Sequence, residues 1–217
     1  MKSKGKVILF GKTGSGKSTI ANALVTGNEG DQVFGVSAGF RGCTSSLQTA
    51  SGRGWEVVDT IGLGESTTGT VSSEDVENMI LEFLKNVKNN YSHIIYVKSG
   101  AERFTIMDEK IWAAFTSVFE GAEESFIVLI THKNQRWLNT QWDDGSLPKW
   151  IRDLGKNRVF ITSLPPVDED EETEKEYKII RDESLATLEI ELERSFAERE
   201  YKYSSPTINQ MNESQLR

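Results

Sequence analysis

Residues 11–18 read Gly11-Lys12-Thr13-Gly14-Ser15-Gly16-Lys17-Ser18 and match the phosphate-loop pattern G-x-x-x-x-G-K-[ST] at every required position. An apolar run at residues 6–10 precedes them and has the pattern of a strand buried on both faces. Residues 18–25 follow, with apolar side chains at helical spacing. Because a phosphate loop joins a strand to a helix, this context predicts a polyphosphate site at the helix N-terminus.

The residue types in this loop suit the chemistry of phosphate binding. Glycines allow successive backbone N–H groups to turn toward an anion, and Lys17 reaches the β- and γ-phosphates. The Ser18 hydroxyl is the expected ligand for Mg²⁺. A chance glycine-rich turn is the alternative interpretation, but such a turn has no reason to lie between a strand and a helix. The sequence therefore predicts a Mg²⁺-dependent nucleotide-binding protein.

A second motif begins 41 residues after Ser18, where the apolar run at residues 55–58 ends at Asp59. Gly62 follows three residues later. In a phosphate-loop protein, an Asp at a strand end holds Mg²⁺ through water, and a Gly there brings its N–H close to a γ-phosphate. The motif is weak alone, but its position after an apolar strand predicts part of the same site.

A third polar segment, Thr131-His132-Lys133-Asn134, follows the apolar run at residues 126–130. A nucleotide base needs discriminating contacts at such a strand end. The segment is therefore predicted to face the base, with a polar turn that has no role as the alternative.

The rest of the chain alternates strand and helix patterns, which indicates an α/β fold with helices on both faces of a mostly parallel sheet. A hairpin of residues 44–50 and 55–59 is expected to add one antiparallel edge strand, and a Trp-rich loop is expected after residue 130. Further strands are predicted at 93–97 and 159–161. Further helices are predicted from about residue 72, from Thr105, at 149–154 and at 173–200, and Asp108 is the expected capping partner of Thr105. The last helix is expected to dock on the domain through Ile179, Ile180, Leu188 and Leu192.

Composition excludes several classes of protein. The 217 residues are 37% hydrophobic, so the chain can bury a core without disulfides, and the single Cys43 fits a reducing compartment. No apolar run reaches the length of a membrane span, and no membrane anchor is apparent. These features predict a cytoplasmic protein.

The net charge of −8 is concentrated near the C-terminus. Residues 168–200 hold 14 acidic and 5 basic side chains, which leaves the rest of the chain nearly neutral and without a basic face for nucleic acid. On these patterns the chain divides into a domain at 1–165, an acidic linker and helix at 166–203, and a tail at 204–217 that is expected to be disordered.

The order of the motifs resembles that of a GTPase, and more narrowly the AIG-type G domain of plant avirulence-induced and animal immunity-associated GTPases, related to the chloroplast-import receptor GTPases. The likeness covers roughly residues 5–165 and rests on four segments. These are the phosphate loop, Cys43-Thr44-Ser45-Ser46-Leu47-Gln48, Arg103-Phe104-Thr105 with Asp108 and Trp112, and Asn157-Arg158. The resemblance implies a P-loop NTPase G domain, a three-layer α/β/α sandwich, that binds GTP or GDP with Mg²⁺.

The resemblance also implies roles for individual residues. Thr44 would complete the Mg²⁺ shell beside Ser18 and Asp59, and Asp59 and Gly62 would sense the γ-phosphate. Lys17, Thr44 and Gly62 would act in hydrolysis. The nucleotide-binding set would be Gly11, Lys12, Thr13, Gly14, Ser15, Gly16, Lys17, Ser18, Thr19, His132, Asn134 and Ser163.

Two features leave alternatives open. Asn134 stands where an acid is more usual, and an amide has one acceptor oxygen where a carboxylate accepts from both guanine N1–H and the exocyclic amine. The choice between guanine and adenine therefore stays open, as does a P-loop kinase acting on a small molecule. A third possibility is a nucleotide-binding scaffold that hydrolyses little and works by nucleotide-controlled self-assembly.

Hydrolysis is expected to be slow. Leu63 follows Gly62, where Ras-like switches have a Gln that orients the attacking water. The family resemblance implies that two molecules pair across their nucleotide faces, and Arg103 is the candidate to reach the partner's γ-phosphate as a catalytic residue. The alternative is that Arg103 pairs with a local acid such as Glu102 or Asp108.

Overall fold

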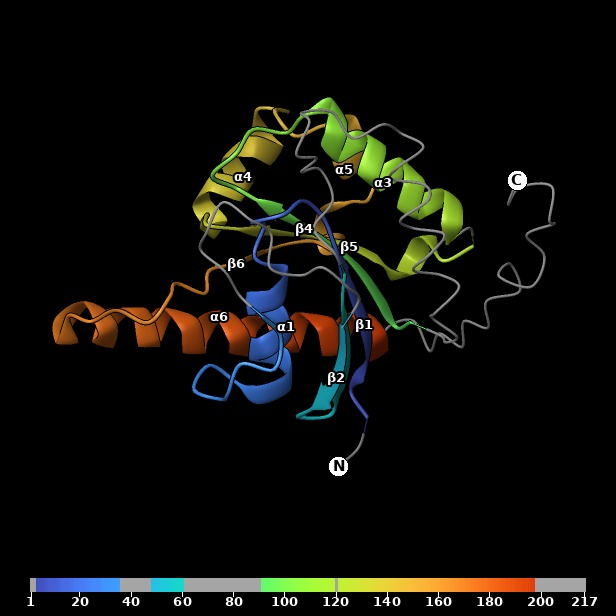
Figure 1. Cartoon of the computed structure of the whole chain (residues 1–217). Helices are drawn as coiled ribbons and strands as arrows, with labels where there is room; N and C mark the ends of the chain where they lie inside the picture. Colours follow the sequence, from blue (N-terminus) through green and yellow to red (C-terminus); the bar gives the residue numbers. More distant parts are fainter. Residues whose placement is uncertain (1–2, 36–47, 61–90, 120, 198–217) are drawn as a thin grey trace, which may run out of the picture.

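A computed structural model describes residues 3–35, 48–60, 91–119 and 121–197 as a six-stranded sheet between two layers of helices (Figure 1). The strand order is β2-β3-β1-β4-β5-β6, and only β2 runs antiparallel to its neighbour. The strands are β1 (Gly5–Phe10), β2 (Gln48–Gly52), β3 (Trp55–Asp59), β4 (His93–Ser99), β5 (Phe126–Thr131) and β6 (Val159–Thr162). This topology confirms the predicted three-layer α/β/α class with one antiparallel edge strand.

The apolar runs form strands because both of their faces are covered. Every residue of β4 and β5 is buried, and Val7 to Phe10 of β1 have no exposed surface. Such strands carry continuous apolar sequence rather than alternation. The phosphate loop and the third motif therefore follow interior strands, β1 and β5, each of which pairs with a neighbour on both sides.

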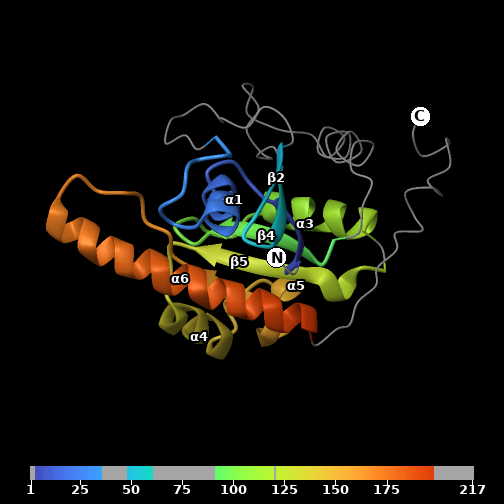
Figure 2. The same ribbon diagram turned by 90° about the horizontal axis from the view of Figure 1, so that it is seen from below.

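Helices α1 (Lys17–Thr26) and α6 (Glu171–Ala197) cover one face of the sheet, and Figure 2 shows α6 extending across that face. Helices α3 (Ile106–Val118), α4 (Gln135–Asp143) and α5 (Lys149–Arg152) cover the other face. Short 3₁₀ turns at Glu123–Ser125 and Lys156–Arg158 precede β5 and β6. No helix in the described ranges is long and apolar enough to cross a membrane.

Two predictions about helices were wrong. The segment expected to be a Trp-rich loop after β5 forms α4, whose first turn is capped by Asn134. In α6, Leu188 and Leu192 dock as predicted, but Ile179 and Ile180 are 57% and 39% exposed. The buried stripe instead continues through Leu185 to Arg181, because these positions lie one helical turn apart along the docked face.

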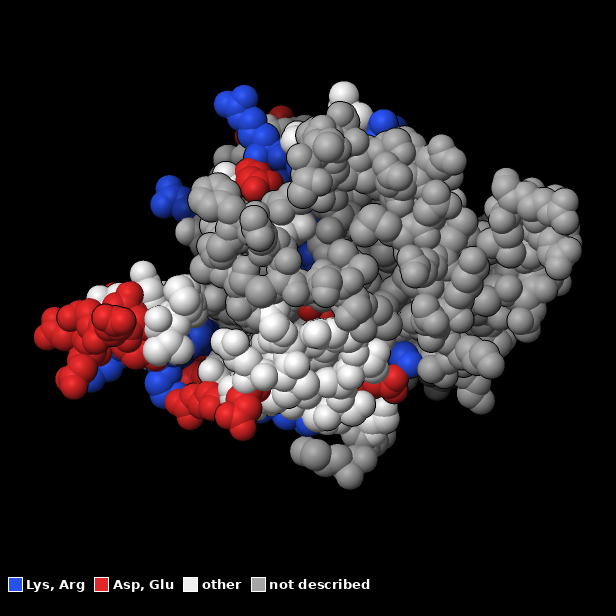
Figure 3. Space-filling model, in the orientation of Figure 1, with Lys and Arg blue, Asp and Glu red and all other residues white. Residues whose placement is uncertain are grey.

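The first turn of α6 carries a group of acidic residues. Helix α6 begins with Glu171, Glu172 and Glu174 in its first turn, and this end projects beyond the sheet as a strongly negative surface (Figure 3). Acidic side chains at a helix N-terminus complement the helix dipole. The helix predicted from residue 72, Cys43 and the tail at 204–217 lie outside the described residues.

Candidate functional site

The phosphate loop wraps around the N-terminus of α1 at the carboxyl end of β1. Gly11 has φ of 142°, and a Cβ at this position would lie 2.3 Å from the backbone oxygen of Val97 on β4. Only glycine fits so close to the neighbouring strand. Gly14 and Gly16 also have positive φ, at 74° and 97°. The loop glycines are therefore needed for the path of the backbone.

Lys17 lies inside this loop. Its Nζ donates hydrogen bonds to the backbone oxygens of Gly11 (3.1 Å) and Lys12 (2.9 Å), and the residue is 6% exposed. Burial lowers the pKa of Lys17 to about 8, although the Asp59 carboxylate opposes that shift. A partly desolvated cation whose bonds within the described residues go to carbonyl oxygens gains strongly from an anion placed beside it.

Ser18 and Asp59 meet directly beside Lys17. The Ser18 hydroxyl donates to Asp59 Oδ2 at 2.6 Å, and Asp59 is fully buried. Burial raises the pKa of this carboxyl, while the hydrogen bond from Ser18 and the charge of Lys17 act in the opposite direction. Asp59 Oδ1 is buried and accepts no hydrogen bond from any described residue. A hydroxyl and a carboxylate with an unused oxygen fit a hard divalent cation such as Mg²⁺.

The predicted base-contacting residues share one cavity at the carboxyl ends of β5 and β6. This cavity of about 900 Å³ is lined by His132, Asn134 and Ser163, together with residues of α6. His132 has φ of 58°, a left-handed conformation that is uncommon outside glycine. The Thr131 hydroxyl donates to the Ser15 backbone oxygen at 3.1 Å, so this cavity is tied to the phosphate loop.

Asn134 caps a helix, which the sequence analysis did not predict. Its Oδ1 accepts the backbone N–H of Trp137 at 3.0 Å and caps α4. The signal was present, since Asn is among the preferred capping residues and the following residues form an amphipathic turn. The prediction that Asn134 faces a base is not tested by this contact.

The segment from Arg103 to Asp108 lies beside the phosphate loop. Thr105 and Asp108 form a capping box on α3, as predicted, and Lys12 Nζ donates to Thr105 Oγ1 at 3.3 Å. Asp108 is fully buried, accepts from Tyr96 Oη at 2.6 Å, and lies 3.6 Å from Lys98 Nζ.

Tyr96 and Lys98 lie on β4 and were missed, because the sequence predicted only a buried strand there. Lys98 is 1% exposed, and the buried carboxylate of Asp108 partly compensates its charge. Burial is the largest single effect on the pKa of Asp108 and acts to raise it. Hydrogen bonds from Tyr96 and Thr105 and the charge of Lys98 together outweigh burial, so the pKa is lowered.

Arg103 is exposed, and among the described residues it forms no ion pair with Glu102 or Asp108. The alternative, that Arg103 pairs with one of these local acids, is therefore not seen among the described residues. Thr44 and Gly62, predicted to contact Mg²⁺ and the γ-phosphate, lie outside the described residues.

Several solved structures of GTP-binding proteins share this arrangement of strands and helices. Toc33 from Arabidopsis thaliana, in complex with Mg²⁺ and GMPPNP, is 20% identical with a TM-score of 0.58, over 89% of this chain and 85% of that chain. A dimerization-deficient Toc33 variant from the same plant is 18% identical with a TM-score of 0.59, over 89% of this chain and 84% of that chain. A probable GTP-binding protein, EngB, is 18% identical with a TM-score of 0.53, over 89% of this chain and 100% of that chain. At these identities the likeness establishes the fold.

Sequence comparisons identify the family. Immune-associated nucleotide-binding protein 7 of Arabidopsis thaliana is 27% identical over 129 residues, which are 57% of this chain and 39% of that curated relative. The chain thus spans less than half of the relative's length. The profile of the AIG1 family matches residues 5–153, from β1 to the end of α5, which is more than half of the chain. The chain therefore belongs to the AIG1 family.

Proposed function

We propose that this protein binds GTP with Mg²⁺ and hydrolyses it to GDP and phosphate as a nucleotide-controlled switch or self-assembling scaffold. The observation that carries the proposal is the arrangement of the buried Lys17 and Asp59 with the half-buried Ser18, with 2.6 Å between the Ser18 hydroxyl and the Asp59 carboxylate. One cation beside two oxygen ligands supports a site for a triphosphate together with a divalent ion. Membership of the AIG1 family and the fold of GTP-binding proteins support the same function.

Each of these residues has a separate role in the proposed site. Ser18 would hold Mg²⁺ through its hydroxyl and Asp59 through the oxygen that has no described partner, directly or through water. When bound, Mg²⁺ supplies positive charge beside the β- and γ-phosphates. Lys17 would exchange its two carbonyl bonds for phosphate oxygens and keep its proton. Thr44 and Gly62 remain the proposed contacts that report the γ-phosphate.

Guanine is the proposed base. His132, Asn134 and Ser163 line the cavity at the strand ends, and the bond from Thr131 to Ser15 keeps that cavity beside the phosphate loop. This spatial relation supports one nucleotide spanning the phosphate loop and the cavity. Toc33, which shares the fold, is solved with a guanine nucleotide analogue and Mg²⁺.

Measurement of affinity for GTP, GDP, ATP and XTP, with and without Mg²⁺, tests the binding part of the proposal. We expect a preference for GTP and GDP, loss of binding in Lys17→Ala, and loss of the Mg²⁺-dependent part of GTP affinity in Ser18→Asn. Lys149→Ala is the matched control, since Lys149 is an exposed lysine on α5 away from the phosphate loop. Equal affinity for ATP and GTP, or unchanged binding in both loop variants, would contradict the proposal.

Hydrolysis is proposed to be slow in the single molecule and faster in a nucleotide-dependent homodimer. Leu63 cannot orient water, whereas Arg103 is exposed and has no ion-pair partner among the described residues. An arginine-to-alanine variant of Toc33 is described as dimerization deficient, which supports a role for an arginine in pairing within this fold. An arginine supplied in trans raises GTPase rates by about 10³–10⁵.

Phosphate release at increasing protein concentration tests this part. We expect activity per molecule to rise with concentration in the wild type and to stay low in Arg103→Ala. Arg136→Ala serves as the control, since Arg136 is an exposed arginine on α4. Activity that is independent of both concentration and Arg103 would refute the proposed pairing, and release that requires an added acceptor would favour a kinase.

The location of the protein and the boundaries of its segments also remain proposals. We propose a cytoplasmic protein with a G domain at 1–165 and an acidic helical extension at 166–203, and imaging of a tagged chain together with limited proteolysis would test them.

A further inference from the structure

The proposed base pocket needs an acceptor that the third motif does not supply. Guanine presents two neighbouring donors, N1–H and the exocyclic amine. Asn134 Oδ1 already accepts the Trp137 N–H at 3.0 Å, and its other polar atom, Nδ2, only donates. His132 and Ser163 carry no anionic group. A group from outside the strand ends is therefore required.

Helix α6 forms the remaining wall of the cavity. Ile180, Glu183, Ser184 and Thr187 line it from this helix, and Glu183 is the one carboxylate among the described lining residues. The Ser163 backbone N–H donates to Ser184 Oγ at 3.4 Å, so the loop after β6 is attached to α6 next to Glu183. Glu183 thus belongs to the same pocket as His132 and Ser163.

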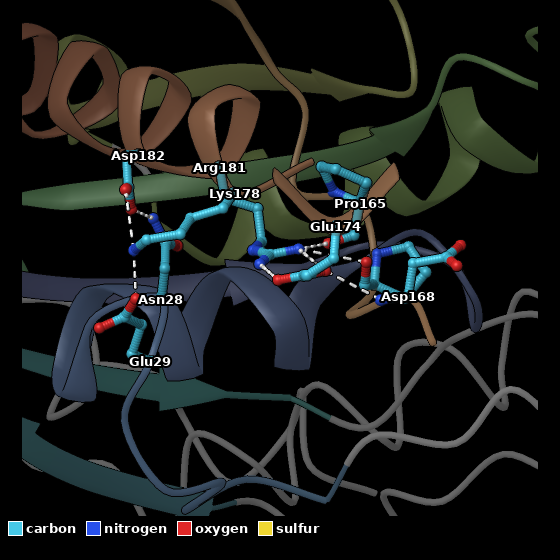
Figure 4. A network of polar contacts seen from close by, with 9 residues as sticks. Asn28, Glu29, Pro165, Asp168, Glu174, Lys178, Arg181 and Asp182 are labelled. Carbon is cyan, nitrogen blue, oxygen red and sulfur yellow. Dashed lines mark hydrogen bonds and ion pairs between the residues drawn. The ribbon is translucent and has the colours of Figure 1, made fainter. Parts of the chain in front are cut away.

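Contacts of the two residues before Glu183 hold this part of α6 against the domain. Arg181 is 6% exposed and donates to the backbone oxygens of Pro165 and Pro166 and to Glu174. Asp182 accepts from Asn28 at 3.0 Å, as Figure 4 shows. Since Arg181 and Asp182 are held by the domain, Glu183 is presented at a defined position.

Glu183 differs from the neighbouring acids because it is not already used. Glu174 pairs with Arg181, and Asp182 pairs with Lys178 at 3.3 Å. Within the described ranges, the Glu183 carboxylate has neither a hydrogen-bond donor nor a cation as its partner, although it lines the cavity. An exposed carboxylate with both oxygens unused is suited to accept two parallel hydrogen bonds.

We propose that Glu183 of α6 is the guanine-specificity residue, accepting the N1–H and the exocyclic amine of the base in place of the acid that is absent at position 134. This proposal rests on the proposed function, since it names the group that selects the base in that site. It also makes the acidic helix part of the nucleotide site. The alternative, that the exposed carboxylate only interacts with solvent, predicts no effect on base preference.

Replacement of the carboxylate by an amide separates these possibilities. Xanthine has a carbonyl oxygen where guanine has the exocyclic amine, so an amide at position 183 pairs with xanthine by accepting N1–H and donating to that oxygen. We expect Glu183→Gln to lower GDP affinity about tenfold or more. The ratio of XDP to GDP affinity should rise by at least the same factor. Glu176→Gln, an equally exposed acid on the same helix that does not line the cavity, is the matched control.

Titration of GDP, XDP and ADP into the full chain, with the unfolding midpoint of each variant measured alongside, gives the readout. An XDP-to-GDP ratio that matches the wild type, including the case in which both affinities fall together, would overturn the role of Glu183. A wild type that binds ADP as tightly as GDP would instead contradict the proposed function, so the two failures are distinguishable.

Discussion

Raising the pH above neutrality is expected to weaken nucleotide binding through Lys17. Burial lowers the pKa of Lys17 in the free protein to about 8, from an ordinary value of 10.5. Phosphate oxygens beside Nζ favour the charged form, so the proposed nucleotide complex keeps the proton at pH values where the free protein has lost it. Binding then takes up a proton, and the affinity must fall as the pH rises.

The magnitude follows from the pKa. A group with a pKa of about 8 is roughly 90% protonated at pH 7, half protonated at pH 8 and roughly 10% protonated at pH 9. GDP affinity should therefore fall about tenfold from pH 7 to pH 9, with uptake of about half a proton per complex at pH 8. The free energy of unfolding of the free protein has the opposite dependence. The unfolded chain binds the extra proton between about pH 8 and 10.5, so the contribution of Lys17 to stability increases with pH across that window.

Calorimetric titration of GDP in two buffers with different enthalpies of ionisation measures the proton uptake directly. Lys17→Arg is the control, because a guanidinium stays protonated over this range. The ionisation of free GDP is measured separately and subtracted. Affinity that stays constant between pH 7 and 9, with no proton uptake at pH 8, would refute the assignment of Lys17 as the buried cation that receives the phosphates.

Three substitutions test the packing through their effect on the free energy of unfolding. Leu188→Ala should lower the free energy of unfolding by about 3 kcal/mol in urea denaturation, because Leu188 is 2% exposed between α6 and the sheet. Ile179→Ala should change it by less than about 0.5 kcal/mol, and equal effects of the two variants would contradict the described rotation of α6. Gly11→Ala should abolish nucleotide binding and cost more than about 2 kcal/mol, since the added Cβ meets the Val97 oxygen at 2.3 Å; a variant with normal affinity would argue against the loop geometry.

Much of the fold could be predicted because its signals are local. The central strands bury both faces, so Ile94 and Val128 lie in apolar runs that need no knowledge of their partners. The capping box of Thr105 and Asp108 is likewise readable at a spacing of three residues. Phosphate binding by a glycine-rich loop depends on backbone N–H groups, and a short motif is therefore sufficient to predict it.

The docking face of α6 could not be obtained in this way. Its buried stripe runs through Arg181, Leu185, Leu188 and Leu192, whereas Ile179 and Ile180 lie off the stripe. Burial of an arginine is costly unless acceptors compensate it, and the two terminal nitrogens of Arg181 donate to Glu174 and to the backbone oxygens of Pro165 and Pro166. Because hydrophobicity alone excludes Arg181 from a core, the sequence pattern pointed to the isoleucines instead.

The sequence by itself determined the α/β class, the phosphate loop and the expectation that Ser18 and Asp59 belong to one site, because each depends on short-range pattern or on a strand end whose place in the sheet is predictable. Only the tertiary structure decided which residues line the cavity proposed for the base. Asn134 proved to cap α4, and Glu183 reached the same cavity from α6, about fifty residues further along the chain. The position of such a group depends on helix rotation, which is set by buried polar contacts rather than by sequence periodicity.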